Sequence, residues 1–77
     1  MNSTHVYRGY LFTIDYHPQE PAYIVAFPDL PEIITSGDTL AGAFAHACEA
    51  LDLHLESLQK LGLPIPTPKH HLVVESK

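Results

Sequence analysis

Residues 36–62, SGDTLAGAFAHACEALDLHLESLQKLG, decide the fold of this chain. From Leu40 onward, apolar side chains return every three or four residues, which is the spacing of one face of an α-helix. The residues of this stripe are Leu40, Phe44, Ala47, Leu51, Leu55, Leu58 and Leu61. The opposite face is polar and is predicted to meet solvent or a partner; it carries His46, Glu49, Asp52, Glu56, Gln59 and Lys60.

Both ends of this helix are marked in the sequence. Asp38 or Thr39 can cap the helix by accepting a hydrogen bond from a free amide of the first turn. Gly62 favours a left-handed C-terminal stop, and Pro64 forbids continuation. We therefore expect a single long helix between these signals.

Length and charge bound what the chain can do. Its 77 residues predict one domain, residues 1–77 with a core over about 7–75, close to the size at which oligomerisation is a common remedy for a small core. Nine acidic residues against four basic ones give a net charge of -5 without a basic cluster. This balance argues against direct DNA binding and suits a basic partner.

The cellular setting is predicted from what the sequence lacks. Cys48 is the only cysteine, which excludes an internal disulfide and a multi-cysteine zinc site and fits a reducing cytoplasm. The chain has no secretory signal and no apolar run of about 20 residues, so we expect a cytoplasmic protein without a membrane span.

The segment before the helix predicts three strands. Residues 1–6 show no pattern and are expected to fray, whereas residues 7–16 alternate between apolar and polar side chains, as a strand does. The turn at residues 17–21 leads into a second strand over 22–27, which forms an antiparallel hairpin with the first. A short third strand over Glu32–Thr35 follows the break at Pro28–Pro31.

The segment after the helix predicts an extended return and a last strand. Three alternating prolines over 64–68 favour a polyproline-like crossing, and residues 71–75 favour a strand. A right-handed crossover would place that strand parallel to a neighbour, plausibly the strand over 7–16. The predicted fold class is α+β, in the order β-β-β-α-β.

Both faces of the predicted sheet carry apolar side chains. Tyr10, Phe12, Ile14 and Tyr16 share one face, and the other face includes Leu11, Ile24 and Ala26. One helix covers only one face, so a homo-oligomer, dimer or tetramer, or a permanent heteropartner is expected to cover the second.

Four stretches in a fixed order resemble the HicB-like antitoxin domain. They are YIVAFPDLP at 23–31, TSGDTL at 35–40, the alanine-rich helix through Ala43, Ala47, Ala50 and Leu51, and GLPIPTP at 62–68. The resemblance covers about residues 10–75. It implies a partial, degraded ribonuclease-H-like sheet with one long helix on one face.

The resemblance also implies a function. Members of that family are non-enzymatic antitoxins that bind and occlude HicA, a small basic toxin that cleaves messenger RNA, and many repress their operon through a C-terminal DNA-binding segment. Two features depart from the family pattern. No DNA-binding domain is expected after the fourth strand, and Gly42 stands where the helix start usually has an acidic residue.

Candidate catalytic and metal-binding residues have simpler interpretations. A metal-dependent nuclease would use Asp15, Glu49 and Glu75, but acidic residues near strand ends are usually only solvated. The pairs His46 with Glu49 and His70 with His71 do not repeat the spacing of a closed metal site. Cys48 lies among alanines and is expected to pack. We therefore predict no catalytic residue, no metal site and no cofactor.

The predicted contacts with a basic toxin are acidic. The Pro28–Pro31 loop contains Asp29 and is followed by Glu32; it either presents these acids in a fixed geometry or serves only as a rigid corner between two strands. Further predicted contacts are Asp38, Asp15 and Glu20. The alternative functions are an orphan structural or small-ligand-binding oligomer and the metal-dependent nuclease.

Overall fold

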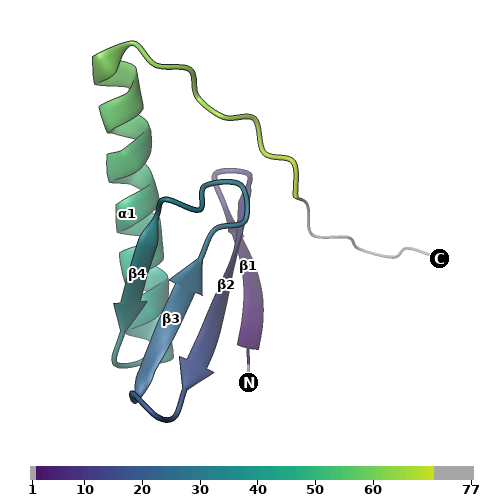
Figure 1. Cartoon of the computed structure of the whole chain (residues 1–77), viewed down its shortest axis with the longest axis vertical. Coiled ribbons are helices and arrows are strands. Elements are labelled where there is room, and N and C mark those ends of the chain that lie inside the picture. Colours follow the sequence, from purple (N-terminus) through teal and green to yellow (C-terminus); the bar gives the residue numbers. More distant parts are fainter. Residues whose placement is uncertain (1, 71–77) are drawn as a thin grey trace, which may run out of the picture.

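The structure, a computed structural model, describes residues 2–70. One antiparallel sheet in the order β1-β2-β3-β4 is covered on one face by a single helix (Figure 1). The elements are β1 (Asn2–Tyr7), β2 (Tyr10–His17), β3 (Ala22–Ala26), β4 (Ile34–Gly37) and α1 (Leu40–Leu61). The predicted α+β class and the single long helix are confirmed.

Helix α1 begins and ends at the predicted signals. Thr39 is the N-cap, and its Oγ1 accepts a 2.9 Å hydrogen bond from the Gly42 amide. The first turn has no acidic residue, so Thr39 caps without a reciprocal partner. Gly62 has a φ of 70°, and its amide bonds to carbonyls of the last turn. This left-handed conformation is one that glycine adopts without steric cost.

The core lies between α1 and the sheet. The helix contributes Ala43, Ala47, Leu51 and Leu55, each spaced four residues from the next. The sheet and its loops contribute Tyr10, Phe12, Ile14, Val25, Phe27, Leu30 and Ile33. The predicted stripe is correct at Ala47, Leu51 and Leu55, which are buried. It is wrong at Phe44, which is 37% exposed, and at its ends, where Leu40 and Leu61 are 46% and 72% exposed. A helix of 22 residues is about 33 Å long and overhangs the short strands.

The expectation that residues 1–6 fray is wrong, because β1 pairs with β2 over its whole length, from Asn2 opposite Asp15 to Tyr7 opposite Tyr10. A two-residue turn at Arg8 and Gly9 joins the strands, with φ values of 53° and 85°. The strand predicted over 7–16 is thus divided at this turn. Two positive φ values suit the twist of an antiparallel hairpin.

The position of β1 also corrects the predicted topology. Strand β2 has β1 on one side and β3 on the other, so no further strand can lie beside it in this sheet. The predicted parallel pairing of a last strand with β2 is therefore wrong for this structure. The strand predicted over 71–75 itself lies outside the described residues.

The remaining strand predictions are close to the structure. The β2–β3 hairpin and its turn are confirmed, with Ile14 opposite Val25. The strand expected over Glu32–Thr35 is wrong in its bounds: β4 begins two residues later, because turn hydrogen bonds from Leu30 to Phe27 and from Ile33 to Leu30 keep Glu32 in the preceding loop.

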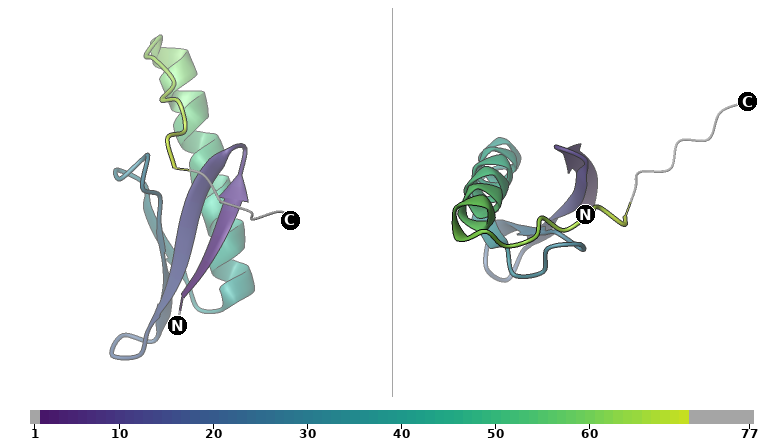
Figure 2. Two further views of the ribbon diagram at one scale, coloured as in Figure 1. Left: turned by 90° about the vertical axis from the view of Figure 1, so that its right-hand side faces the viewer. Right: turned by 90° about the horizontal axis from the view of Figure 1, so that it is seen from above.

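Residues 63–70, called here the strap, leave the end of α1 and cross one end of the sheet (Figures 1 and 2). They belong to no helix or strand, as the alternating prolines predict. The Tyr10 hydroxyl donates a hydrogen bond to the Pro66 carbonyl. Pro68 lies near Gly9 in the β1–β2 turn. The strap therefore spans the sheet end from α1 to the β1–β2 turn.

Candidate protein-binding surfaces

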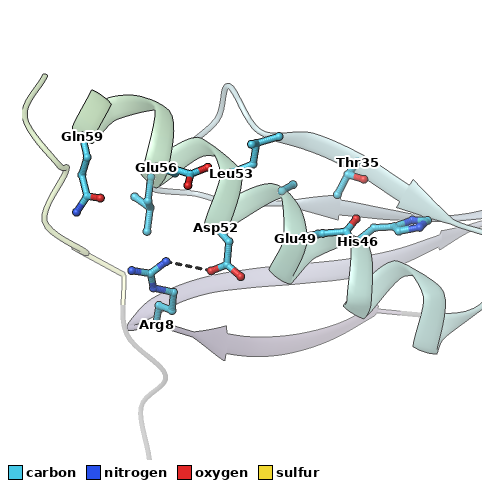
Figure 3. A pocket seen from close by; sticks show the side chains of 10 residues that line it. Arg8, Thr35, His46, Glu49, Asp52, Leu53, Glu56 and Gln59 are labelled. Carbon is cyan, nitrogen blue, oxygen red and sulfur yellow. Dashed lines mark hydrogen bonds and ion pairs between the residues drawn. The ribbon is translucent and has the colours of Figure 1, made fainter. Parts of the chain in front are cut away.

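The side of α1 that faces away from the sheet is acidic and has an open hollow of about 920 Å³ beside it (Figure 3). The residues that line the hollow come mainly from about four successive turns of the helix. They include His46, Glu49, Ala50, Asp52, Leu53, Leu55, Glu56 and Gln59, with Arg8 and Thr35 from the sheet side. We call the exposed part formed by Glu49, Asp52, Leu53 and Glu56 the α1 surface.

The acidic residues of the α1 surface differ in whether they form an ion pair. Asp52 forms a 3.0 Å ion pair with Arg8 and accepts a 3.0 Å hydrogen bond from the Tyr7 hydroxyl. That hydrogen bond raises the pKa of Tyr7 above its ordinary value. No ion pair joins Glu49 or Glu56 to another residue in the range 2–70. Two free carboxylates therefore flank Leu53, which is 64% exposed.

Two histidines attach α1 to β4 and the loop before it. His46 Nδ1 donates to the Ser36 carbonyl at 2.7 Å, and His54 Nε2 lies 2.8 Å from a Glu32 carboxylate oxygen. A carbonyl of an edge strand is thus occupied by the chain's own helix, which protects that edge. These histidines have structural partners, and no group of three potential ligands within residues 2–70 could hold a metal ion.

Asp15 and Glu49, the two described carboxylates of the alternative nuclease hypothesis, do not lie together. Asp15 alternates with the buried Phe12 and Ile14 along β2 and so lies on the sheet face opposite α1. Glu49 is on the outer side of α1, beyond the core. Glu75 lies outside the described residues. Burial, followed by the nearby Asp52 charge, raises the pKa of the Cys48 thiol, which fits a packing role.

The five acidic residues predicted to bind a partner lie at two ends of the molecule. Asp15 and Glu20 are near the β2–β3 turn, at the end where β4 also finishes and Asp38 precedes α1 (Figure 1). Asp29 and Glu32 are in the β3–β4 loop at the other end, beside the strap. The structure does not bring all five into one contact surface.

Asp29 has an internal role that the sequence did not indicate. Its carboxylate accepts hydrogen bonds from the backbone amides of Lys69 and His70, at 2.6 and 2.9 Å, and lies 2.5 Å from His70 Nδ1. The side chain is 7% exposed. The His70 amide, its ring and the Lys69 amide together lower the Asp29 pKa to about 2. Asp29 therefore fastens the strap and presents little carboxylate to a partner.

The face of the sheet opposite α1 has no covering layer among the described residues (Figure 2). Alternation from the buried positions places Val6, Leu11, Thr13, Ile24, Ala26 and Ile34 on it. Ile34 is 81% exposed and Val6 is 44% exposed. We call these six residues the open face; the predicted second apolar face of the sheet is thus present.

Comparison with known proteins identifies the family. The sequence profile described as "HicB_like antitoxin of bacterial toxin-antitoxin system" matches residues 10–76. Antitoxin HicB 1 of Photorhabdus laumondii and Antitoxin HicB of Escherichia coli K12 are each 37% identical over 60 residues, 73% of this chain. Antitoxin HicB 2 of Photorhabdus laumondii is 34% identical over 68 residues, 83% of this chain.

The match covers only part of each relative, and it is not accompanied by a match to a solved structure. It covers 39%, 44% and 48% of these three relatives, so the chain spans less than half of their length. No solved structure matches the chain, so the ribonuclease-H-like assignment stays a prediction. No helix within residues 2–70 is long and apolar enough to cross a membrane. The profile nevertheless covers most of the chain, which belongs to the HicB-like antitoxin family of bacterial toxin-antitoxin systems.

Proposed function

We propose that this protein is a cytoplasmic, non-enzymatic antitoxin that binds a small basic HicA-type ribonuclease and covers its RNA-cleaving surface. The observation that supports this proposal is the family match over residues 10–76. The acidic character of the chain, with a net charge of -5, suits a basic partner. Occlusion requires shape and charge but no catalytic group.

The α1 surface is the first candidate for the toxin contact. Glu49 and Glu56 supply unpaired charge, and Leu53 between them supplies apolar area. An exposed apolar residue ringed by acids fits a partner that presents an apolar side chain among lysines or arginines. Because these groups stand on a helix packed against the core, they are held in position before the toxin arrives.

The acids predicted from the sequence extend this proposal. Glu32 is joined to α1 through His54 and keeps about half of its side chain exposed, so it can contribute at the margin of the α1 surface. Asp15, Glu20 and Asp38 form a second candidate contact at the opposite end of the molecule. Asp29 supports binding indirectly, by fixing the strap.

Co-expression with a short basic toxin of the HicA type tests the proposal. The complex is purified through a tag on the toxin, and toxin cleavage of RNA is measured with and without this chain. We expect a stable complex and suppressed cleavage. Absence of a complex, with undiminished cleavage, would reject the antitoxin function and favour an orphan oligomer instead.

Two charge-reversed variants locate the contact. The variant Glu49→Lys with Glu56→Lys is expected to weaken binding at least 100-fold, because it replaces two attractive charges with two repulsive ones. The matched variant Asp15→Lys with Glu20→Lys changes the net charge equally at the other end of the domain. A larger loss from the second variant would move the contact to that end.

A further inference from the structure

Arg8 is the one arginine or lysine among the described residues that line the hollow beside α1. It lies in the β1–β2 turn, and Figure 3 shows its side chain pointing to Asp52, with 3.0 Å between a guanidinium nitrogen and a carboxylate oxygen. Both side chains are 48% exposed, so water reaches the pair. A protein that binds the α1 surface therefore meets a positive charge beside the acids.

The backbone of Arg8 has a conformation that does not suit arginine. Its φ is 53°, and the φ of the following Gly9 is 85°. A two-residue turn with two positive φ values favours asparagine or aspartate followed by glycine. Most other residues are strained there, because the Cβ atom crowds the backbone. An arginine at this position indicates that its role lies in the side chain and in its contact with Asp52.

Asp52 is the middle one of three carboxylates on the outer side of α1. Glu49 precedes it by three residues and Glu56 follows it by four, so neighbouring carboxylates are about one helical turn apart. Arg8 neutralises the middle carboxylate, and the Tyr7 hydroxyl donates to its other oxygen. The free protein thus presents two outer acids with a neutralised acid between them.

The pair of Arg8 and Asp52 opposes the binding of isolated cations. Ion pairs between exposed side chains contribute little to stability, because water solvates both charges. A foreign cation that pairs with Asp52 must separate it from Arg8, so one ion pair replaces another and little is gained. Arg8 is also tethered to the same chain, which keeps it beside Asp52 at an effective concentration of about millimolar order. Only a partner with further contacts on this surface can displace Arg8.

We infer that Arg8 competes with a partner's cation for Asp52 and so limits both the affinity and the range of partners of the α1 surface. This inference rests on the proposed toxin contact at the same surface. The partner that fits presents three cationic groups in a row over about 10 Å, because Glu49 and Glu56 are seven residues apart on the helix. Its outer cations pair with the glutamates, and its central cation displaces Arg8. A basic protein without this spacing leaves Arg8 in place.

Calorimetric titration of the full chain with a purified basic toxin of the HicA type tests the inference. Arg8→Asn should bind the toxin about fivefold more tightly than the wild type, because Asp52 becomes available to the toxin. Asparagine suits the positive φ of this turn, so the variant is expected to fold. Arg8→Lys keeps a cation beside Asp52 and should change the affinity by less than about twofold.

Two further variants separate competition from other causes. Lys60→Gln also removes one positive charge, from the last turn of α1, and Lys60 forms no ion pair within residues 2–70. It should change the affinity by less than about twofold. Asp52→Asn added to Arg8→Asn should return the affinity to about that of the wild type, because the gain requires the freed carboxylate.

Salt dependence provides an independent check. The affinity of Arg8→Asn should fall more steeply with salt than that of the wild type, because its complex contains an additional ion pair. Wild-type binding without a gain in Arg8→Asn would overturn the inference and leave the proposed function intact. An equal gain in Lys60→Gln would also overturn it, since net charge alone would then be responsible. Absence of toxin binding in every variant would instead reject the proposed function, and the inference with it.

Discussion

The two faces of the same sheet have opposite environments. On the face toward α1, Phe12 and Ile14 are completely or almost completely buried, and Val25 is 1% exposed. On the open face, Ile34 is 81% exposed although it is just as apolar. The fold of residues 2–70 therefore leaves part of the apolar surface of its strands exposed, chiefly at Ile34 and Val6.

The largest expected difference between the two faces is in the loss of stability when neighbouring residues on β2 are replaced by alanine. Phe12→Ala should lower the free energy of unfolding by about 3–5 kcal/mol, because it leaves a cavity in the core. Leu11→Ala removes a side chain from the open face and should cost less than about 1.5 kcal/mol in dilute solution. Urea unfolding of both variants measures the difference. Equal losses would mean that the open face is covered even in the monomer.

A substitution at the contact between β4 and α1 is expected to cause the next largest loss of stability. A Cβ atom at Gly37 would lie 2.4 Å from the Ala43 amide nitrogen, which is part of the helix backbone and cannot rotate away. Gly37→Ala should therefore destabilise by about 2–3 kcal/mol. Ser36→Ala, at an exposed neighbouring site, is the control and should change stability by less than about 0.5 kcal/mol. Similar effects of both would contradict this close approach.

The helix cap should have a smaller effect. Thr39→Ala removes the oxygen that accepts the Gly42 amide and should cost about 1 kcal/mol. Thr39→Ser keeps the hydroxyl and should restore most of this loss. Thermal unfolding followed by circular dichroism measures both variants. If Thr39→Ser were as unstable as Thr39→Ala, the methyl group rather than the cap would be responsible.

Acid should release the strap without unfolding the sheet. The pKa of Asp29 is about 2, below its ordinary value of 3.8, so its contact stabilises the strap fully above pH 3.8. The contact should be lost as the pH falls from about 3.8 through about 2. Amide chemical shifts of Lys69 and His70 should report this transition. It should disappear in Asp29→Asn and persist in Asp38→Asn; persistence in Asp29→Asn would assign it to another group.

Local signals predicted the helix and the central hairpin. Thr39, Gly62 and Pro64 mark the helix ends by short-range chemistry, and the alternation of β2 identifies Phe12 and Ile14 as core residues. β1 was missed because Asn2–Tyr7 is mostly polar and its burial comes only from pairing with β2. The signal that could have revealed it is Gly9 between Tyr7 and Tyr10, which is typical of a two-residue hairpin turn.

The candidate surfaces were less predictable because they depend on distant contacts. The pattern of the helix indicated the polar face with Glu49 and Glu56, but it could not show that Arg8 neutralises Asp52 between them. Asp29 looked available to a partner, yet it binds amides 40 and 41 residues further along the chain. Such pairings are set by the tertiary fold, and no local spacing encodes them.

One measurement tests most directly whether the α1 surface binds the toxin. Sedimentation velocity of this chain mixed with a basic HicA-type toxin is compared for the wild type, Glu49→Lys with Glu56→Lys, and Ile34→Glu on the open face. The charge-reversed variant should lose the toxin, whereas Ile34→Glu should bind it as the wild type does. Unchanged toxin binding by the charge-reversed variant, or loss of binding in Ile34→Glu alone, would contradict the assignment of the toxin contact to the α1 surface.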